Sequence, residues 1–422
     1  MRYVQELTIP LTELSGADAD LTEEERAMQQ SLRRFSLDVL RPNGVICDKM
    51  TAEEMLEPGS LWWQTMEQFQ TLGLDYKATE GMDRRIAGRM MSIVFEELSW
   101  GDIGMAFSAL VAGFPDGAAH GAGRDDLADW CSTQMGCWII TQPDRGSDSL
   151  QTNARDLGAG GQPHRGNLSA KWMGDHVVLN GQSSAWVSGA PVATCAIVQV
   201  PCDYGDGIFK EDGSVNGVSL IADLTLDGVA KGKPLEKIGQ RCLPQGEVFF
   251  DNVKVSTDNV LWSGDDYPNS VFSMLTDGNM SLGPSFVGVA QAALDHAIDY
   301  VHERKQGGVP LIEHQHVRHR LYKLFEKVEA ARALGRRVME YNFVAPSPHL
   351  MYSVPSKVFC GDAAVEVTNE AMQLFGGNGL TKEYPMEKLM RDARPATVED
   401  GENHVLGLVA ADWISKCYQS SN

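Results

Sequence analysis

The order of hydrophobic and polar positions divides the chain into a helical part, a β-rich part and a second helical part. Near the start, Thr22 followed three residues later by Glu25 is the pattern of a capping box, which predicts the first turn of a helix. Residues 89–99 are dense in Met, Ile, Val and Phe and predict another helix. We therefore expect an N-terminal α-helical domain over residues 1–137.

The middle of the chain carries short β-branched or alternating runs, which predict strands. Clusters of Gly, Asn and Asp such as Asn180-Gly181 separate these runs and indicate turns. The Gly-rich stretch 158–166 is expected to be a solvated loop. The pattern is typical of a small antiparallel barrel or sandwich, and we assign it to a central β domain over residues 138–262. The four clearest runs are residues 176–180, 193–200, 218–224 and 247–255.

From about Asn279 the apolar positions return to steps of three and four residues, which is the period of an amphipathic helix. A third helix of this kind is expected over residues 357–375, ending at Gly376-Gly377 as a C-cap. Long helices with apolar stripes predict a C-terminal four-helix bundle over residues 263–422, so the fold class is α+β. The stripes contain Val287, Ala290, Leu294, Ala297 and Val301 in one helix, and Val317, Leu321, Leu324, Val328, Ala331 and Val338 in the next.

Charge and composition narrow the classes of function. The 422 residues carry a net charge of −21, which disfavours binding to nucleic acid or to an anionic membrane surface. No secretory signal and no spanning segment is visible, and the eight cysteines form no CxxC pair. A cytoplasmic protein with reduced thiols is the simplest interpretation. His314, His316 and His319 lack carboxylate or cysteine partners at ligand spacing, so we expect no metal site.

Five motifs follow one another between Thr141 and Arg394. The most specific is Thr141-Gln142-Pro143-Asp144-Arg145-Gly146-Ser147-Asp148. The others are 178–181 with 186–188, 235–241 with 248–253, 303–306 with 310–315, and 373–379 with 383–394. Together they resemble the signatures of the acyl-CoA dehydrogenases, including "TEPxxGSD", in which Gln142 replaces the usual Glu. The resemblance covers at least residues 141–409.

The resemblance implies FAD as the cofactor, bound between subunits of a homotetramer or homodimer. An isoalloxazine ring needs hydrogen bonds to its polar edge and an apolar or aromatic wall. The positions that match the family's flavin, acyl-CoA, pyrophosphate and adenosine contacts are Thr141, Ser147, Trp186, Ser188, Arg304, Gln306, Gln373 and Gly377. Among them, Arg304 matches an arginine that reaches the pyrophosphate from a neighbouring subunit.

The resemblance also places the catalytic base on Asp400, where most of the family has Glu followed by Gly. A thioester α-proton is weakly acidic, so its base must be a carboxylate of raised pKa in a dry pocket. Asp400 is shorter than Glu by one methylene, or about 1.5 Å. Family members with this Asp include enzymes of cyclohexane-type carboxyl-CoA esters, which suggests a cyclic, branched or otherwise atypical acyl group. Glu399 is the alternative base.

Further positions depart from the family's pattern. Gly278-Asn279 replaces a Glu-Arg pair, so an arginine at the mouth of the active site is expected to be missing. Gly307 replaces an aromatic residue, and Glu402 and His404 stand where the family touches the FAD of a neighbouring subunit. We therefore count Glu402 and His404 among the expected cofactor contacts and expect a rearranged interface.

Three hypotheses follow for the function. The first is an acyl-CoA dehydrogenase that forms a 2-enoyl-CoA, with hydride transfer to flavin N5 and an electron-transfer flavoprotein as acceptor. The second keeps the fold but changes the chemistry, as in an acyl-CoA oxidase or a non-oxidative elimination or desulfinase-type enzyme. The third is a catalytically silent subunit that binds an active paralogue. Retention of a carboxylate at Asp400 favours the first.

Overall fold

A computed structural model describes residues 14–74, 76–150, 165–211 and 213–421. Most of the stretch 158–166, expected to be a solvated loop, lies outside these residues. The N-terminal part is helical. Its helices are α1 (Glu23–Phe35), α2 (Arg41–Cys47), α3 (Ala52–Met55), α4 (Leu61–Gln70), α5 (Arg84–Ala112), α6 (Phe114–Gly121) and α7 (Asp125–Cys131).

The start of α1 confirms the predicted capping box. The Thr22 hydroxyl accepts the backbone N–H of Glu25 at 3.2 Å, and the Glu25 carboxylate accepts the N–H of Thr22 at 2.8 Å. The predicted helix over residues 89–99 is the middle of the longer α5, which is interrupted by an extended backbone at Asp102. The Asp102 side chain stabilises this kink, because its Oδ1 accepts the backbone N–H of Met105 at 2.9 Å and so caps the helical segment that follows.

The central part is a β domain built around one eight-stranded sheet. Its strands are β1 (Gly136–Ile139), β2 (Ser169–Trp172), β3 (His176–Gln182), β4 (Val187–Ser188), β5 (Cys195–Asp203), β6 (Gly217–Asp223), β7 (Val229–Lys231), β8 (Gln245–Gly246), β9 (Val248–Ser256) and β10 (Val260–Ser263). The sheet order is β10-β6-β5-β2-β3-β9-β7 with β1 paired to β5, while β4 and β8 form a separate pair. All four predicted strands are present, with ends that differ from the prediction by at most three residues.

Two strand pairs differ from the expected antiparallel pattern. β1 and β2 both run parallel to β5, so the sheet is mixed. Long excursions of the chain separate β1 and β2 from β5, and such connections can bring strands together in either direction. Alternation within one strand reports only which face is buried, and therefore could not predict this pairing.

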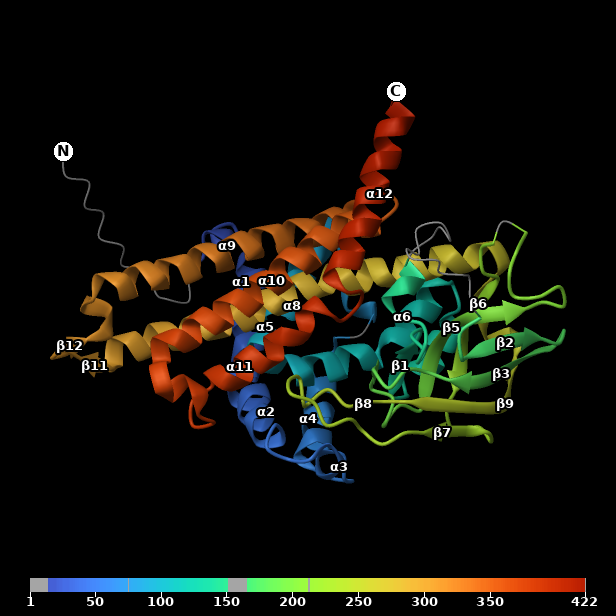
Figure 1. Ribbon diagram of the computed structural model, residues 1–422, viewed down its shortest axis with the longest axis horizontal. Coiled ribbons are helices and arrows are strands. Elements are labelled where there is room, and N and C mark those ends of the chain that lie inside the picture. The colour runs from blue at the N-terminus through green and yellow to red at the C-terminus, as the bar shows by residue number, and fades with distance from the viewer. Residues whose placement is uncertain (1–13, 75, 151–164, 212, 422) are drawn as a thin grey trace.

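The C-terminal part is a bundle of long helices. Its elements are α8 (Tyr267–Glu303), β11 (Lys305–Gln306), β12 (Val309–Pro310), α9 (Gln315–Val344), α10 (Leu350–Phe375), α11 (Met386–Ala393) and α12 (Asn403–Ser421). α8 packs against α10, α9 and α5. Figure 1 shows these helices running lengthwise, with the β domain at one end and the β11–β12 hairpin at the other.

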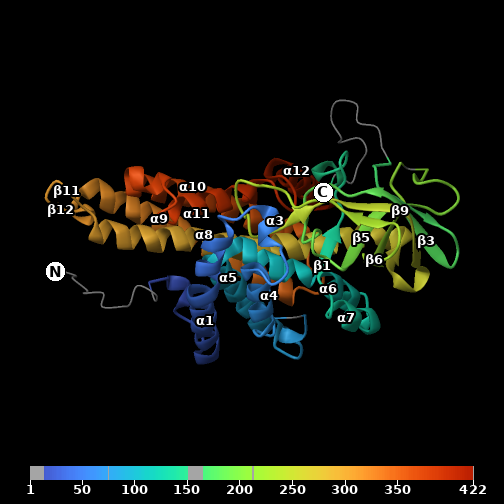
Figure 2. The same cartoon turned by 90° about the horizontal axis from the view of Figure 1, so that it is seen from below.

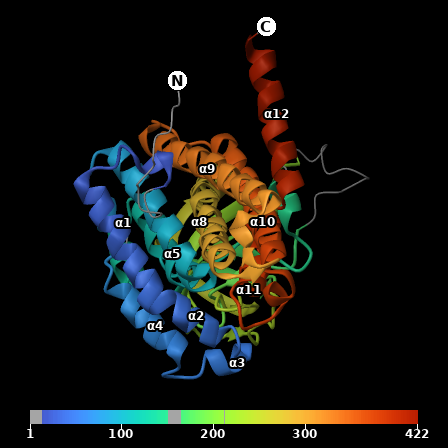
Figure 3. The ribbon, with the colours of Figure 1, turned by 90° about the vertical axis from the view of Figure 1, so that its left-hand side faces the viewer.

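α10 begins seven residues before the predicted start at 357, since Pro355 is accommodated within the first turns of the helix. Pro355 is the sixth residue of the helix, so it removes the backbone hydrogen bond that would otherwise reach the Met351 carbonyl, yet the helix continues through it. The predicted end at Phe375 is confirmed, and Gly376 follows with a positive φ of 57°. α12 projects away from the rest of the bundle in Figures 1 and 3.

The N-terminal helices cover one side of the bundle, as Figures 2 and 3 show. Buried ion pairs join the two layers. Glu96 of α5 accepts Arg332 of α9 at 2.7 Å and Arg336 at 3.2 Å, and the side chains of Glu96 and Arg332 are almost fully buried. Removal of one partner from such a pair leaves an uncompensated charge away from water.

This pairing predicts a large loss of stability for Arg332→Met. The free energy of unfolding should fall by about 3 kcal/mol, because Glu96 remains buried with an incomplete set of partners. Denaturant or thermal unfolding measures the change. Lys323→Met is the matched control on the same helix, since its pair with Glu326 is exposed and screened by water, and its loss should leave the stability nearly unchanged. Equal effects of the two substitutions would contradict the account.

Candidate active site

The loop that carries Asp400 has an unusual backbone. Asp400 has φ of 49° and Gly401 has φ of 103°, so two successive residues lie in the region that L side chains rarely adopt. At Gly401 a Cβ atom would lie 2.8 Å from Leu406 Cδ2 and 2.9 Å from Leu150 Cδ1. Glycine is therefore required at 401 for both conformation and space.

Three surrounding elements hold this loop by hydrogen bonds. The Asn279 amide of α8 donates to the Asp400 carbonyl at 3.1 Å, and the Lys357 ammonium of α10 donates to the Gly401 carbonyl at 2.7 Å. The backbone N–H of Glu402 donates to the Ser147 hydroxyl at 3.0 Å. Ser147 begins the 3₁₀ helix η5 (Ser147–Leu150), so the contact joins the loop to the first of the five motifs.

Gly278 provides the space for the Asp400 side chain. A Cβ atom at 278 would lie 2.7 Å from Asp400 Oδ2, which is too close for any side chain without displacement of the carboxylate. Asn279 is fully buried beside it. The Gly278-Asn279 pair thus has a structural role in placing the loop, in addition to the loss of an arginine expected from the sequence.

The two carboxyl groups of the loop are both harder to ionise than usual. Burial raises the pKa of Asp400, and the Lys357 charge opposes this shift. Burial and the neighbouring Asp400 charge raise the pKa of Glu399 to about 7, against the hydrogen bond from Gln240 and the charges of Lys357 and Lys237. Gln240 Nε2 donates to Glu399 Oε1 at 3.2 Å. Raised carboxyl pKa values are typical of general bases.

Thr141, Trp186 and Ser188 come together on the β domain. The Thr141 and Ser184 hydroxyls lie 2.6 Å apart, and Ser184 also accepts the backbone N–H of Trp186 at 3.3 Å. Gln245 Nε2 donates to Ser188 Oγ at 3.1 Å. The Trp186 side chain is 62% exposed, which is unusual for an indole and fits an aromatic wall for a flat ring system such as a flavin.

Gln142, the residue that departs from the "TEPxxGSD" pattern, is part of the support beneath this surface. Its Oε1 accepts the backbone N–H of Leu168 at 2.7 Å, at the start of the segment that leads into β2. A Glu carboxylate could accept the same bond. The Nε2 of Gln142 has no hydrogen-bond partner among the described residues.

Arg304, Gln306, Gln373 and Gly377 lie at the opposite end of the molecule. Arg304 caps the end of α8 and Gln306 is in β11, while Gln373 and Gly377 are at the end of α10, and all four are exposed. Figure 1 shows β11 and β12 at the end of the bundle away from the β domain. One chain does not bring these four residues to Thr141 and Trp186. A Cβ at Gly377 would meet nothing within 4 Å, so nothing within one chain requires glycine there.

Glu402 and His404 lie at the start of α12. The Glu402 carboxylate accepts the backbone N–H groups of His404 at 2.9 Å and Val405 at 3.1 Å, and pairs with the His404 ring at 2.8 Å. The His404 pKa is raised and the Glu402 pKa is lowered by this hydrogen bond. Within one chain Glu402 is therefore a helix cap, and the His404 side chain is 95% exposed.

Sequence reasoning missed Lys357 and Gln240 as neighbours of the loop that carries Glu399 and Asp400. Lys357 lies in α10 among apolar and small residues, and its charge in such a stretch was the available signal. Gln240 holds a positive φ of 46° and donates its backbone N–H to Asp392 at 2.6 Å. No pattern in the sequence marks that conformation.

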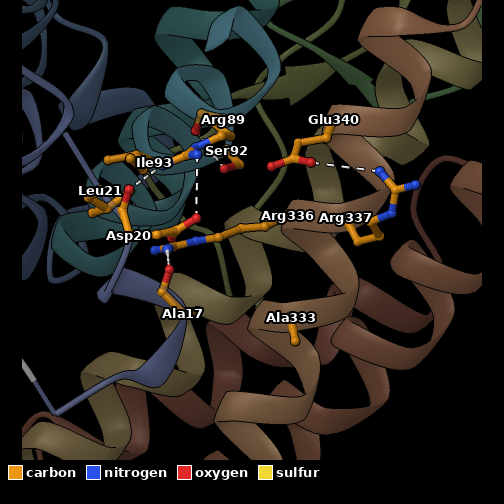
Figure 4. A pocket seen from close by; sticks show the side chains of 10 residues that line it. All are labelled: Ala17, Asp20, Leu21, Arg89, Ser92, Ile93, Ala333, Arg336, Arg337 and Glu340. Atoms are coloured by element: carbon orange, nitrogen blue, oxygen red, sulfur yellow. Dashed lines mark hydrogen bonds and ion pairs between the residues drawn. The ribbon is translucent and has the colours of Figure 1, made fainter. Parts of the chain in front are cut away.

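A cavity of about 170 Å³ lies away from the base loop, between the N-terminal segment, α5 and α9 (Figure 4). Arg89 and Arg336 line this cavity, but both guanidinium groups are already paired with protein groups. Arg89 pairs with Glu25 at 2.8 Å, and Arg336 donates to the Ala17 carbonyl at 3.1 Å. The cavity therefore belongs to the packing between the layers rather than to the active site.

No helix in the described part of the chain combines the length and the apolar character needed to cross a membrane. No group of three or more His, Cys, Asp or Glu residues in the described ranges could hold a metal ion. The eight cysteines form no disulfide.

A carboxylate loop and an exposed indole on the β domain are features that a flavin-dependent oxidoreductase requires, and comparison with known proteins leads to the same class. A family model described as "Acyl-CoA dehydrogenase, C-terminal domain" matches residues 269–415. The glutaryl-CoA dehydrogenase of Desulfococcus multivorans is 29% identical over 411 residues, which cover 93% of this chain and 97% of that protein. The chain is thus similar to a glutaryl-CoA dehydrogenase over nearly its whole length, and its residues 269–415 match the C-terminal domain of the acyl-CoA dehydrogenases.

Other relatives agree on the family and the fold. The probable acyl-CoA dehydrogenase FadE25 of Mycobacterium tuberculosis is 31% identical over 281 residues, and the alignment covers 65% of each protein. A glutaryl-CoA dehydrogenase of Mycobacterium smegmatis in complex with FADH2 has a TM-score of 0.77 and 18% identity, covering 94% of this chain and 95% of that one. That structure holds FADH2, and the exposed Trp186 of this chain fits the aromatic wall that a flavin needs.

The raised pKa of Glu399 predicts how stability depends on pH. In the folded protein this carboxyl titrates near 7 instead of 4.5, so the folded state binds the extra proton between these values. The stability of the wild-type protein should therefore fall, relative to Glu399→Gln, as the pH rises from about 4.5 to 7. We expect a difference of about 1–2 kcal/mol above pH 7, after discounting for solvent screening. Thermal unfolding across this pH range measures it, and parallel curves would contradict the shift.

Proposed function

We propose that the protein catalyses α,β-dehydrogenation of an acyl-CoA thioester to a trans-2-enoyl-CoA, with Asp400 as the base. The observation that carries this proposal is the contact between Ser147 Oγ and the backbone N–H of Glu402. It joins the motif that begins at Thr141 on the flavin side to the loop that holds Asp400. A base beside a flavin surface is the arrangement that dehydrogenation requires, since the α-proton and the β-hydrogen leave in opposite directions.

Each residue of the site has a task in this reaction. Asp400 removes the α-proton, and its raised pKa lets it hold that proton afterwards. Asn279 and Lys357 fix the backbone on both sides of the carboxylate, which limits the reorganisation needed when charge moves. Thr141, Ser188 and Trp186 would hold the flavin ring, and Ser147 lies beside the acyl-CoA. Bound FAD supplies the acceptor for the β-hydrogen as hydride.

The shorter Asp at position 400 bears on the substrate. A base withdrawn by about 1.5 Å must meet an α-carbon that lies closer to the loop. Gly278 leaves the space beside Asp400 free of any side chain. These two features support a cyclic, branched or otherwise atypical acyl group rather than a plain fatty acyl chain. The relative from Desulfococcus multivorans is named for glutaryl-CoA, an acyl group with a second carboxylate.

The expected flavin contacts on the β domain lie far from the expected pyrophosphate and adenosine contacts at the other end of the bundle. This separation supports an oligomer as the active form. Thr141, Trp186 and Ser188 would hold the ring half of an FAD molecule, whereas Arg304 and Gln373 of a second copy would hold the pyrophosphate and adenosine half. A homotetramer, or at least a homodimer, completes each site in this arrangement. An electron-transfer flavoprotein is the expected electron acceptor. The carboxylate of raised pKa at Asp400 argues against a catalytically silent subunit.

Substitution of the base tests the proposal. Asp400→Asn should keep FAD bound yet reduce the flavin at least about 10³-fold more slowly with acyl-CoA, because an amide cannot take up the α-proton. Glu399→Gln is the matched control in the adjacent residue and should retain flavin reduction. Anaerobic stopped-flow absorbance measures both. Flavin reduction that survives Asp400→Asn but not Glu399→Gln would move the base to Glu399.

A methyl group at Gly278 tests the geometry around the base. In Gly278→Ala the new Cβ would overlap Asp400 Oδ2, so the carboxylate must move by several tenths of an ångström or more. A displacement on the order of 1 Å costs about a hundredfold in rate. The thermal midpoint should change little in comparison. Wild-type rates of flavin reduction in this variant would show that Asp400 does not act from the observed position.

A further inference from the structure

Lys357 is among the largest side chains that are completely buried in the described part of the chain. It points from α10 toward the base loop, where its Nζ donates to the Gly401 carbonyl at 2.7 Å and to Asn403 Oδ1 at 2.6 Å. Asn403 in turn donates to Asp362 Oδ1 at 2.9 Å. The lysine is thus anchored on both sides of the turn that follows Asp400.

Packing alone does not account for a lysine at this position. Transfer of an ammonium group out of water costs several kcal/mol, and a methionine would fill a similar volume at no such cost. Both hydrogen-bond acceptors of Lys357 are neutral oxygens, and the lysine makes no direct ion pair among the described residues. The positive charge of Lys357 is therefore not neutralised by a single bonded carboxylate, and it attracts all the acidic groups around it.

Four carboxylates act on the Lys357 ammonium, and they come from the base loop and from α10. Glu399, Asp400 and Glu402 lie on the base loop, and Asp362 lies one turn further along α10. Lys357 lowers the pKa of both Glu399 and Asp400 against the effect of burial. Lys237 is a second cation near Glu399, but its ammonium donates to the Leu243 carbonyl and to Gln245, away from the base loop.

We propose that Lys357 is a positioning residue for the base, whose ammonium fixes the Gly401 carbonyl and whose charge keeps Asp400 ionised before the substrate is deprotonated. This role rests on the proposed function. The lysine does not touch the reacting atoms. It acts through the loop, by holding the left-handed turn and by opposing the cost of a carboxylate charge in a poorly solvated site.

The position of Lys357 also predicts a pH dependence. Burial lowers the pKa of Lys357 to about 8, against the four carboxylates that raise it. The ammonium is therefore charged at pH 7 and loses its proton as the pH rises through 8. Flavin reduction should fall on the alkaline side through this range, since a neutral amine is a weaker donor to the Gly401 carbonyl and holds the turn that carries Asp400 less firmly. On the acid side it should fall as Asp400 becomes protonated.

Lys357→Met is the direct test, carried out on the FAD-loaded protein. Anaerobic flavin reduction by butyryl-CoA, isobutyryl-CoA and cyclohexanecarboxyl-CoA is followed from pH 5.5 to 9.5. At pH 7 the rate constant should fall about a hundredfold, the acid limb should move to higher pH, and the limb near pH 8 should disappear. Lys327→Met is the control, because that lysine lies on α9 in a pair with Glu366 and far from the loop in sequence.

A second measurement separates proton abstraction from flavin reduction. Exchange of the acyl α-hydrogen with D2O, followed by NMR, reports on the base alone and should slow in Lys357→Met by a similar factor. If Lys357→Met fails to fold, Asn403→Asp keeps the lysine but places a competing carboxylate against its ammonium. An acidic residue in the first turn of α12 is compatible with the helix dipole, and the acid limb should again move to higher pH.

The outcomes distinguish this inference from the proposed function. If the wild-type protein neither reduces its flavin nor exchanges the α-hydrogen, the proposed function and the role of Lys357 fail together. If the wild-type protein is active and Lys357→Met or Asn403→Asp keeps the wild-type pH profile, only the role of Lys357 is overturned. A lower thermal midpoint with an unchanged profile would show that the lysine is purely structural.

Discussion

The candidate active site is built on one turn of the backbone, at Asp400 and Gly401. Both residues have positive φ, a conformation that costs free energy for the non-glycine residue and must be stabilised by its surroundings. The stabilising bonds come from Asn279 on α8 and Lys357 on α10, the two helices that form the centre of the bundle. Long helices that share an apolar core are rigid supports. The packing of the whole domain therefore fixes the position of the Asp400 carboxylate.

The same constraint explains why a glycine precedes Asn279. The Asp400 side chain occupies the volume that a side chain at 278 would need. The pair Gly278-Asn279 therefore combines free space for the carboxylate with a donor for its backbone carbonyl. Asp400 contacts the free space at Gly278, and the turn that carries it is bonded to Lys357. A substitution at any of these three positions should therefore displace the carboxylate.

Much of this organisation could be predicted from local patterns in the sequence. The capping box of Thr22 and Glu25, the four long strand segments and the end of α10 depend on neighbours within a few residues, and the structure confirms them. The five motifs predicted the family. Parallel pairing of β1 and β2 with β5 depends on long-range topology, which alternation along one strand does not report.

The environment of the base was only partly predictable. The motif spacing pointed to Asp400, and its partial burial and raised pKa agree with that role. The contact with Lys357 joins residues 44 positions apart, and in sequence the lysine was one polar residue at the start of an apolar stripe. Glu402 was expected to touch the cofactor, yet within the chain it caps α12. Residues with two such roles cannot be assigned from spacing alone.

We propose that this chain holds a flavin beside a carboxylate that deprotonates an acyl-CoA. The most direct test is anaerobic titration of the purified protein with straight, branched and cyclic acyl-CoA thioesters. The account predicts a yellow protein whose flavin absorbance is bleached by at least one of them, with a product two hydrogens lighter. A colourless protein that binds no FAD, or a bound flavin that stays oxidised with every thioester, would contradict it.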